Sequence, residues 1–136
     1  MAPRRSADEA AGTRDALIDA ALEVFAECGY AAAQLEEIAG RAQVTRGAFY
    51  HHFSNNAELY MAVLAERWPV AMAPLTRLLE GSGPSRERIR AFVVAFCTAL
   101  ERDRTVGALL KMSMADASVP ELRGRVQAKA RAMEAW

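Results

Sequence analysis

The sequence of 136 residues predicts an all-α protein. Ala, Leu, Glu and Arg, all of which favour helices, dominate the composition. No stretch shows the strict alternation of β-branched and polar residues that marks a half-buried strand. Apolar residues recur instead at spacings of three and four, which is the pattern of amphipathic helices. Capping and turn residues divide this pattern into seven segments.

The first predicted helix covers residues 14–28. Thr13 is its predicted N-cap, and Gly29 suits a C-cap with a left-handed backbone. Residues 1–11 lack the apolar core of a signal peptide and are predicted to form a flexible arm. Three acidic residues fall away from the apolar stripe of the helix and are predicted to form a solvated face: Asp19, Glu23 and Glu27.

The next two predicted helices are short, at residues 35–42 and 45–53. Gln43 and Val44 form the turn between them, and Thr45 can cap the second helix. Two short helices joined by a turn, after a longer helix, form a helix-turn-helix arrangement. Phe49 and Phe53, which are four residues apart, are expected to face the core.

The fourth predicted helix begins at a capping box formed by Asn55 and Glu58. Its apolar pattern continues to Gly81, but Pro69 and Pro74 are expected to kink or break it. The run Gly81-Ser82-Gly83 predicts a clear end to the helix.

Three further helices are predicted after this break. The fifth starts with Pro84 at its first helical position, and the sixth covers residues 105–115. The seventh opens with a capping box at residues 118–121 and runs to Trp136 without a stop signal. We therefore expect the chain to be a fragment. The apolar stripe of the fifth helix comprises Ile89, Phe92, Val93, Phe96, Cys97 and Leu100, and that of the seventh comprises Leu122, Val126, Ala130 and Met133.

Composition gives few limits on function. The 17 basic and 17 acidic residues cancel, so the total charge gives no indication of nucleic-acid binding. Cys28 and Cys97 are predicted to be buried and reduced, which suits the cytoplasm. The longest apolar run, residues 91–100, is about half as long as a membrane helix. The sequence therefore predicts a cytoplasmic protein without a membrane contact.

Both histidines of the chain lie in the stretch VTRGAFYHHF, residues 44–53. Metal binding is not favoured, because adjacent histidines on a helix point about 100° apart and no cysteine pair accompanies them. Catalysis is not favoured either, because no nucleophile, base and orienting group converge, and we expect no enzyme activity. Tyr50, His51 and His52 cannot all join the core, so some of them must face solvent or a partner.

The same stretch has the residues that a DNA-reading helix needs. Gly47 and Ala48 allow the backbone to approach base edges. Arg46 can donate two hydrogen bonds to guanine or to phosphate. Thr45 at the helix N-terminus suits phosphate, as do the hydroxyl and N–H donors of the three polar aromatic residues that follow. A glycine inside a helix costs roughly 1 kcal/mol, which is reasonable where close approach is required.

The run from Thr13 to about Leu64 resembles the DNA-binding domain of the tetracycline-repressor (TetR) family. It covers somewhat under half of the chain. No single matching residue is specific to this family, but the order and spacing of the matches together make the resemblance strong. The matching marks are Thr13-Arg14, Ala20-Ala21, Phe25, Gly29-Tyr30, Ile38-Ala39, Val44-Thr45, Arg46-Gly47, Tyr50, His52-Phe53 and Leu59.

This resemblance implies a homeodomain-like, three-helix DNA-binding domain at residues 12–60, with its helix-turn-helix unit at 34–53. Residues 61–136 would be a helical ligand-binding and dimerisation domain, incomplete at its C-terminus because two further helices of the family are absent. The implied function is that of a ligand-responsive repressor that binds a palindromic operator as a homodimer. The implied partners are double-stranded DNA and a small-molecule effector, and no cofactor is expected.

The implied DNA-binding residues are Gln34, Thr45, Arg46, Gly47, Ala48, Tyr50, His51, His52 and Asn56. Three positions depart from the family. Gln34 stands where Ser or Thr usually caps the helix, and Gln43 stands where the turn usually has Gly. Asn56 replaces a Lys that contacts phosphate. These departures predict weaker phosphate contacts and a strained turn.

The candidates for an effector pocket are Trp68, Met72, Phe92, Phe96, Leu109, Met112 and Met114. For each of them, ordinary packing in the core is the favoured interpretation. Two other functional hypotheses remain open. The first is a helical ligand-binding or protein-interaction module whose helix-turn-helix no longer binds an operator. The second is a small all-α enzyme or carrier that uses the apolar helices after Gly81.

Overall fold

The computed structural model describes residues 2–115 and 119–124, with side chains from residue 7 onward. Within these ranges every regular element is helical, which confirms the predicted all-α class. Residues 120–124 are also helical. The helices are α1 (Ala2–Cys28), α2 (Leu35–Arg41), α3 (Arg46–His52), α4 (Asn56–Glu80), α5 (Ser85–Arg102) and α6 (Arg104–Ala115).

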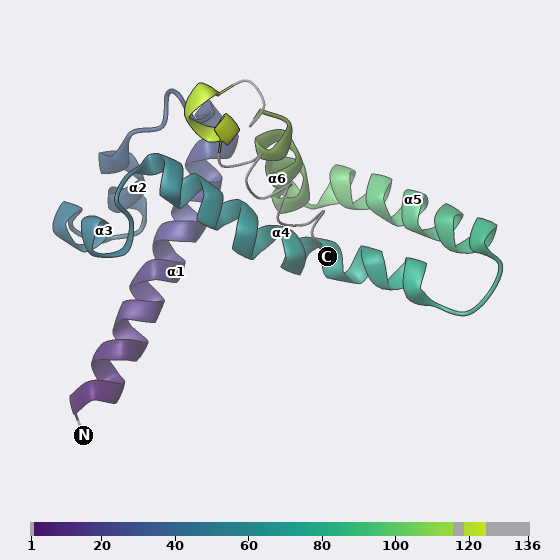
Figure 1. The fold of residues 1–136 in the computed structure, drawn as a ribbon, viewed down its shortest axis with the longest axis horizontal. Helices are drawn as coiled ribbons and strands as arrows, with labels where there is room; N and C mark the ends of the chain where they lie inside the picture. Colours follow the sequence, from purple (N-terminus) through teal and green to yellow (C-terminus); the bar gives the residue numbers. More distant parts are fainter. Residues whose placement is uncertain (1, 116–118, 125–136) are drawn as a thin grey trace.

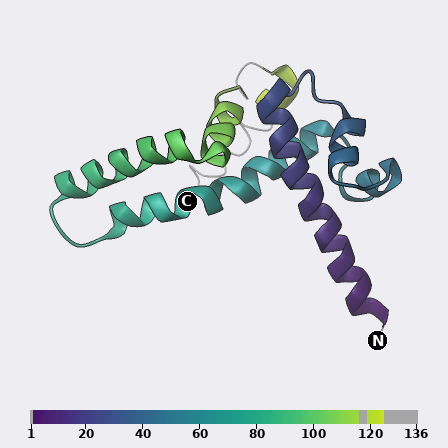
Figure 2. The same cartoon turned by 180° about the vertical axis from the view of Figure 1, so that it is seen from behind.

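The helices form two regions that share α4. Helices α2 and α3 pack beside α1, and the first half of α4 crosses α1 (Figure 1). The second half of α4 and the antiparallel α5 form a hairpin that projects away from this group, as the reverse view also shows (Figure 2). Helix α6 returns from the hairpin and packs against both α1 and α4.

The larger hydrophobic core, which we call the first core, is built around α1. It also contains residues from the far end of the chain, because Leu109, Met112 and Leu122 pack with the side chains of α1, α3 and α4. The Tyr60 hydroxyl donates a hydrogen bond to the Met112 carbonyl oxygen at 2.6 Å. Helix α6 is thus part of the same core as the predicted DNA-binding helices. The largest fully buried side chains are Leu17, Ile18, Val24, Phe25, Ile38, Phe49, Leu59, Tyr60, Val63, Leu109 and Leu122.

A smaller second core lies between the hairpin and the start of α6. Its buried members are Met72, Leu75 and Val106, and half-buried Phe92 and Phe96 pack against them from α5. No residue of α5 is itself buried. The prediction of a fully inward apolar stripe on α5 was therefore wrong in part: Ile89, Val93 and Cys97 are exposed.

The N-terminal end of the structure differs from the prediction. Helix α1 begins at Ala2, so residues 2–13 are helical where a flexible arm was expected. Thr13 is not an N-cap, because its hydroxyl donates to the Glu9 carbonyl oxygen inside the helix at 2.9 Å. The cost of Gly12 in a helix, about 1 kcal/mol, is too small to end it. A proline at position 3 is tolerated in a first turn. This end of α1 extends away from the other helices (Figure 1).

Helix α4 is also longer than expected, because it continues through Pro69 and Pro74 to Glu80. Each proline removes one backbone hydrogen bond, but both prolines are exposed, and water can hydrate the freed carbonyl groups. The predicted break at residues 81–83 is confirmed, and Pro84 is the N-cap of α5 rather than its first helical residue.

Cys28 and Cys97 are exposed thiols, so the prediction that both are buried was wrong. Cys28 lies in the last turn of α1, where its Sγ donates to the Val24 carbonyl oxygen at 3.2 Å. Across residues 2–115 and 119–124, no helix has both the length and the apolar character needed to span a membrane.

Candidate nucleic-acid interface

The turn between α2 and α3 has the geometry expected for a helix-turn-helix. Gln43 has a φ of 57°, in the left-handed region that favours glycine. The Gln43 N–H donates to the Gly40 carbonyl at 3.1 Å, and the Val44 N–H donates to the Ala39 carbonyl at 3.0 Å. These two bonds form a Schellman motif, in which a side chain replaces the usual glycine. The strain predicted at Gln43 is therefore present in the fold.

Helix α3 is fixed at both ends. The Thr45 hydroxyl accepts a hydrogen bond from the Ala48 N–H at 3.1 Å, which confirms Thr45 as the N-cap. Phe49 and Phe53 are buried in the first core, as predicted, and hold the inner face of the helix. The outer face is accessible: Thr45, Arg46, Gly47, Tyr50 and His51 are exposed, and Ala48 and His52 are half-buried.

Gly47 has no role in packing within the chain. A Cβ atom placed on it would meet only the Thr45 hydroxyl oxygen, at 3.9 Å, which is an ordinary contact. The fold thus has room for alanine, which favours a helix by about 1 kcal/mol over glycine. A residue that destabilises its helix without a packing reason supports the prediction that a partner approaches the backbone here.

Arg46 does not lie free on this surface. Its guanidinium forms an exposed ion pair with Glu36 of α2, with an Nη1–Oε1 distance of 3.0 Å. The Arg46 Cζ atom lies 5.7 Å from the centre of the Tyr50 ring. Ring and carboxylate together hold the guanidinium at the start of α3. A DNA phosphate or guanine would have to compete with Glu36 for it.

The two histidines at the end of α3 have different surroundings. Partial burial, followed by the charges of His51 and Arg14, lowers the pKa of His52 below its ordinary value of 6.5. Near pH 7 His52 is therefore neutral and offers one N–H donor. The two imidazole rings meet edge to face, with centroids 5.3 Å apart.

Arg14 is a positioning residue to which the sequence reasoning gave no role. Its guanidinium lies over the Phe53 ring, 5.2 Å from the centroid, at the C-terminal end of α3. It also makes a two-pronged ion pair with Glu66 of α4, at 2.6 and 2.8 Å. Arg14 thus joins α1, α4 and the end of α3. Its place in the Thr13-Arg14 mark of the family was the available signal.

Gln34 and Asn56, the outer members of the predicted contact set, differ from α3 in their surroundings. Gln34 is exposed at the N-cap position of α2, and its side chain makes no capping bond, as expected for Gln. The Asn56 side chain donates from Nδ2 to the Ala33 carbonyl at 3.0 Å and is half-buried. A phosphate contact through Asn56 would require that bond to break.

The start of α4 confirms most of the predicted capping box. Asn55 Oδ1 accepts a hydrogen bond from the Glu58 N–H at 2.9 Å. The Glu58 carboxylate reaches back to the Ser54 N–H at 2.7 Å, one residue before the cap.

Positive charge on the helix-turn-helix is already paired. Residues 34–56 contain two arginines, Arg41 and Arg46. Arg41 bonds to Glu27 at 2.6 Å and to Glu37 at 2.7 Å. The acidic face predicted on α1 is thus not merely solvated, because Glu27 holds Arg41 and Asp19 holds Arg67 at 2.9 Å.

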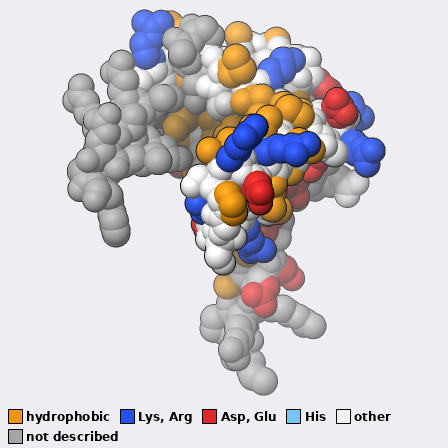
Figure 3. Space-filling view, turned by 90° about the vertical axis from the view of Figure 1, so that its right-hand side faces the viewer, with side chains coloured by type: hydrophobic (Ala, Val, Ile, Leu, Met, Phe, Trp, Pro, Cys, Tyr) orange, Lys and Arg blue, Asp and Glu red, His pale blue; other side chains and the backbone are white. Residues whose placement is uncertain are grey.

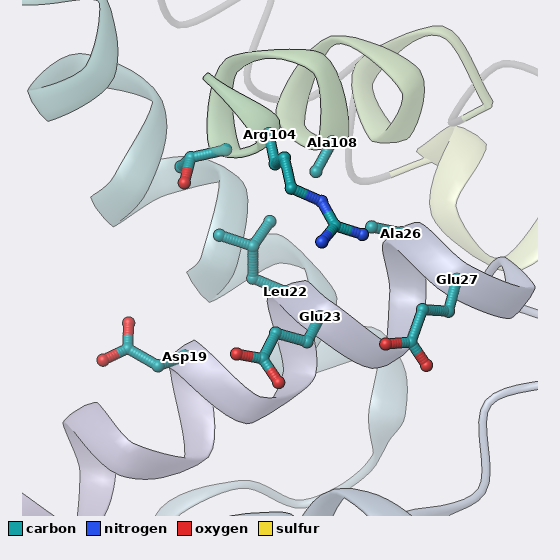
Figure 4. Close-up of a pocket in the computed structure, with 8 residues that line it drawn as sticks. Asp19, Leu22, Glu23, Ala26, Glu27, Arg104 and Ala108 are labelled. Carbon is teal, nitrogen blue, oxygen red and sulfur yellow. The ribbon is translucent and has the colours of Figure 1, made fainter. Parts of the chain in front are cut away.

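A groove lies between α1 and α6, with a volume of about 620 Å³ (Figure 4). Asp19, Glu23 and Glu27 line its α1 side, and Arg104 reaches over it from α6. A second cavity of about 480 Å³ lies beside Tyr30, Asn56 and residues 119–121. Neither is lined by the predicted effector-binding residues.

The structure divides the predicted effector residues between the two cores. Leu109 and Met112 belong to the first core, and Met72 belongs to the second. Phe92 and Phe96 stack with ring centroids 6.0 Å apart at the edge of the second core. Trp68 packs against both cores, and Met114 is 73% exposed.

Comparison with known proteins agrees with this geometry. Residues 17–63 match the family model described as "Bacterial regulatory proteins, tetR family". The transcriptional activator FasR of Mycolicibacterium smegmatis is 41% identical over 90 residues, which are 66% of this chain and 41% of FasR. The regulator SrpR of Pseudomonas putida is 53% identical over 64 residues, which are 47% of this chain and 30% of SrpR.

A solved structure, the SmeT–triclosan complex, is similar in fold with a TM-score of 0.62 and 32% sequence identity. The match covers 88% of this chain and 59% of that chain. The chain spans less than half the length of the two curated relatives that it matches. The matched segment contains α2, α3 and the turn between them, so residues 17–63 form a helix-turn-helix domain of the tetR type.

Proposed function

We propose that this chain acts as a ligand-responsive transcriptional repressor that binds a palindromic operator as a homodimer in the cytoplasm. The observation that carries the proposal is the outer face of α3, where exposed Arg46, Gly47 and Tyr50 stand on a capped helix anchored by buried Phe49 and Phe53. The curated relatives are named as regulators, which favours regulation over catalysis.

Helix α3 enters the major groove in this proposal. Its N-terminal turn has the small residues Gly47 and Ala48, which let the backbone approach base edges. Arg46 leaves Glu36 and donates to guanine or to a phosphate. Tyr50, His51 and His52 donate to phosphate oxygens and set the orientation of the helix.

Effector control would act through α6. This helix is bonded to the DNA-binding helices by Tyr60, and by Lys111, whose Nζ donates to the Ala26 carbonyl oxygen at 3.0 Å. The similar SmeT structure is a complex with triclosan. A ligand that favours one position of α6 over another would change the placement of α3, and DNA affinity would change by the same coupling free energy.

The test is a titration of the purified 136-residue chain against the DNA upstream of its own gene, at about 50 and 200 mM salt. We expect a discrete complex that resists nonspecific competitor and weakens with salt. Transcription from that DNA should fall when the chain is added. An increase in transcription would replace repressor by activator and leave DNA binding intact.

The paired state of Arg46 favours a second candidate, a helical interaction module that no longer reads DNA. The variant Glu36→Gln separates the two functions, because it removes the carboxylate that holds Arg46. If the parent chain binds DNA, Glu36→Gln should bind more tightly and with a steeper salt dependence. If neither binds, and a version extended by a dimerising segment also fails, the interaction module is the better description.

A further inference from the structure

The short helix α2 has little of its own to hold it in place. It has seven residues, whereas isolated helices shorter than about 12–15 residues are marginal in water. Its N-cap residue, Gln34, makes no side-chain capping bond, and the buried residues of this helix are Ile38 and Ala39. The orientation of α2 therefore depends on its contacts with neighbouring helices.

Arg41, in the last turn of α2, joins this helix to α1. Its Nη1 and Nη2 atoms donate to the two carboxylate oxygens of Glu27, in the last turn of α1, at 2.9 and 2.6 Å. Nη2 also donates to Glu37 of α2 at 2.7 Å. Glu23, one turn before Glu27 on α1, has its Oε2 atom 3.7 Å from Nη1. One guanidinium thus holds carboxylates from two helices.

The geometry of this contact sets it apart from ordinary surface ion pairs. A single exposed pair contributes little, but a two-pronged bond within a network of charges is the exception. Two parallel N–H···O bonds fix an angle as well as a distance. The Arg41 side chain is 33% exposed, less than any of its three carboxylate partners. Its bonds to Glu27 and then to Glu37 raise the pKa of Arg41, and the bond from Arg41 lowers the pKa of Glu27.

The contribution of Arg41 to the surface is not its charge. At the end of the molecule where α4 joins α5, basic side chains lie among hydrophobic ones and are open to solvent (Figure 3). Arg41, by contrast, is bonded to carboxylates that offset its positive charge. Its effect on the helix-turn-helix is therefore geometric.

The position of α2 decides where the first turn of α3 lies. The two helices are joined by the short bonded turn at Gln43, so a change in the angle of α2 is passed directly to the start of α3. Helix α2 also carries Glu36, which holds the Arg46 guanidinium at 3.0 Å. The inner face of α3 has its own anchors in the first core, but its N-terminal turn does not include them.

We propose that Arg41 is a positioning residue for DNA binding, which fixes α2 against the end of α1 and so places the N-terminal turn of α3, without touching DNA itself. The inference rests on the proposed function for its effect on DNA affinity. The placement of α2 by Arg41 can be measured without DNA, so the two can fail separately.

A matched pair of α1 variants tests the proposal in the 136-residue chain. Glu27→Gln and Glu23→Gln each remove one acidic charge from the same side of α1, and by charge alone both would strengthen DNA binding. Glu27→Gln also breaks the two-pronged bond, so it should weaken binding by about threefold to tenfold. Glu23→Gln should not weaken it. Fluorescence anisotropy with the DNA upstream of the chain's own gene measures both affinities.

Substitutions of Arg41 separate positioning from a phosphate contact. Arg41→Gln should weaken binding as Glu27→Gln does, and Arg41→Lys should also bind less tightly than the parent, because it keeps the charge but loses the two-pronged bond. The double variant Arg41→Gln/Glu27→Gln should be no weaker than either single variant. The dependence of affinity on salt should stay that of the parent, whereas a lost phosphate contact would lower its slope by about 0.9.

Hydrogen exchange of the free protein tests the placement of α2 alone. Arg41→Gln and Glu27→Gln should speed exchange of the α2 amides severalfold and leave the α1 amides unchanged. Glu23→Gln should leave both helices unchanged. Circular dichroism should show the helix content of the parent in every variant, which separates a shifted α2 from an unfolded chain.

Three outcomes would overturn the proposal. The first is a Glu27→Gln variant that binds DNA as tightly as Glu23→Gln. The second is a reduced salt slope in Arg41→Gln, which would assign Arg41 to a phosphate. The third is unchanged exchange of α2 in both Arg41→Gln and Glu27→Gln. If the parent binds no DNA while these variants speed α2 exchange, the proposed function fails and the placement of α2 by Arg41 stands.

Discussion

The two cores of this chain differ in completeness. Every side chain that is less than 2% exposed among the described residues belongs to the first core, around α1. The second core, between the hairpin and α6, has three buried members, and the least exposed of them, Val106, is 2% exposed. The same kinds of amphipathic helix build both. The comparison shows that an amphipathic helix buries its apolar stripe fully only where other helices pack against it from several sides.

The difference in burial between the two cores suggests a different role for each. The first core fixes α3 through Phe49 and Phe53 and so sets the geometry of the candidate DNA surface. The hairpin leaves apolar side chains of α5 exposed. The stability of the hairpin therefore depends more on whatever else packs against it. The predictions below test this contrast, beginning with the largest expected effect.

A pair of truncations measures the contrast directly. Phe49→Ala empties a fully buried site in the first core and should lower the free energy of unfolding by about 3–5 kcal/mol. Phe96→Ala removes a half-buried ring from the second core and should cost less than about half of that. Urea unfolding followed by circular dichroism gives both values. Equal losses of unfolding free energy would mean that the second core is as tightly packed as the first core.

Arginine truncations compare the two regions in DNA binding. Arg46→Ala should weaken binding to a specific site by roughly tenfold to hundredfold, because α3 loses its only guanidinium. Arg90 is also exposed, but it lies on α5, so Arg90→Ala should leave the affinity of one helix-turn-helix domain for DNA unchanged. Fluorescence anisotropy with a half-site duplex measures both. An unchanged affinity for Arg46→Ala would remove this residue from the reading surface.

The turn before α3 and the turn before α5 each contain a residue with a positive φ angle, but the residue types differ. Gly83 supplies a φ of 129° between α4 and α5, whereas Gln43 holds a φ of 57° with a side chain. Gln43→Gly should therefore raise the free energy of unfolding by about 1 kcal/mol. Gly83→Ala should lower it. If Gln43→Gly destabilises the protein in the same urea assay, the Gln43 side chain makes a contact that outweighs the strain.

Two glycines offer a test with opposite signs. Gly47 in α3 and Gly107 in α6 both have room for a Cβ atom. Replacing either by alanine should stabilise the chain by about 0.5–1 kcal/mol. Only Gly47→Ala should also weaken DNA binding, because the methyl group keeps the backbone from the groove. If Gly47→Ala leaves affinity unchanged, close approach at this position is not needed.

The smallest expected effect is on pH dependence. Burial lowers the pKa of His52 below 6.5, so in the window below pH 6.5 the unfolded chain binds more protons than the folded one. The free energy of unfolding should fall as pH decreases through that window. The His52→Gln variant should lose this slope, whereas stability changes near pH 4, where Glu66 is held ionised by Arg14, should remain. An identical slope in both proteins would assign it to another group.

The sequence was most informative where local chemistry decides the structure. Thr45, Asn55 and Gly29 mark helix ends through one or two hydrogen bonds or one dihedral angle, and all three were identified correctly. Prolines in α4 were misleading, because a break depends on whether water can reach the freed carbonyl groups, and exposure is a property of the whole fold.

Long-range packing was less predictable. The periodicity of α5 predicts an apolar stripe but does not show how much of it is buried. In the structure, Phe92 and Phe96 face inward, whereas Val93 and Val94 are exposed. The pairing of Arg46 with Glu36 was also not predicted, because it depends on the angle between two helices. The DNA-binding residues and the effector pocket remain predictions, and the experiments above are their test.

The placement of α6 has a consequence for modular engineering. The simplest chimeric regulator would take its DNA-binding domain as one contiguous piece of sequence. In this protein, a DNA-binding domain that ended at residue 64 would lose Leu109, Met112 and Leu122 from its core. The Tyr60 hydroxyl would also lose the carbonyl oxygen that accepts its hydrogen bond. The portable unit is therefore discontinuous. A functional transplant would have to carry α6 and residues 119–122 together with the helices that face the DNA.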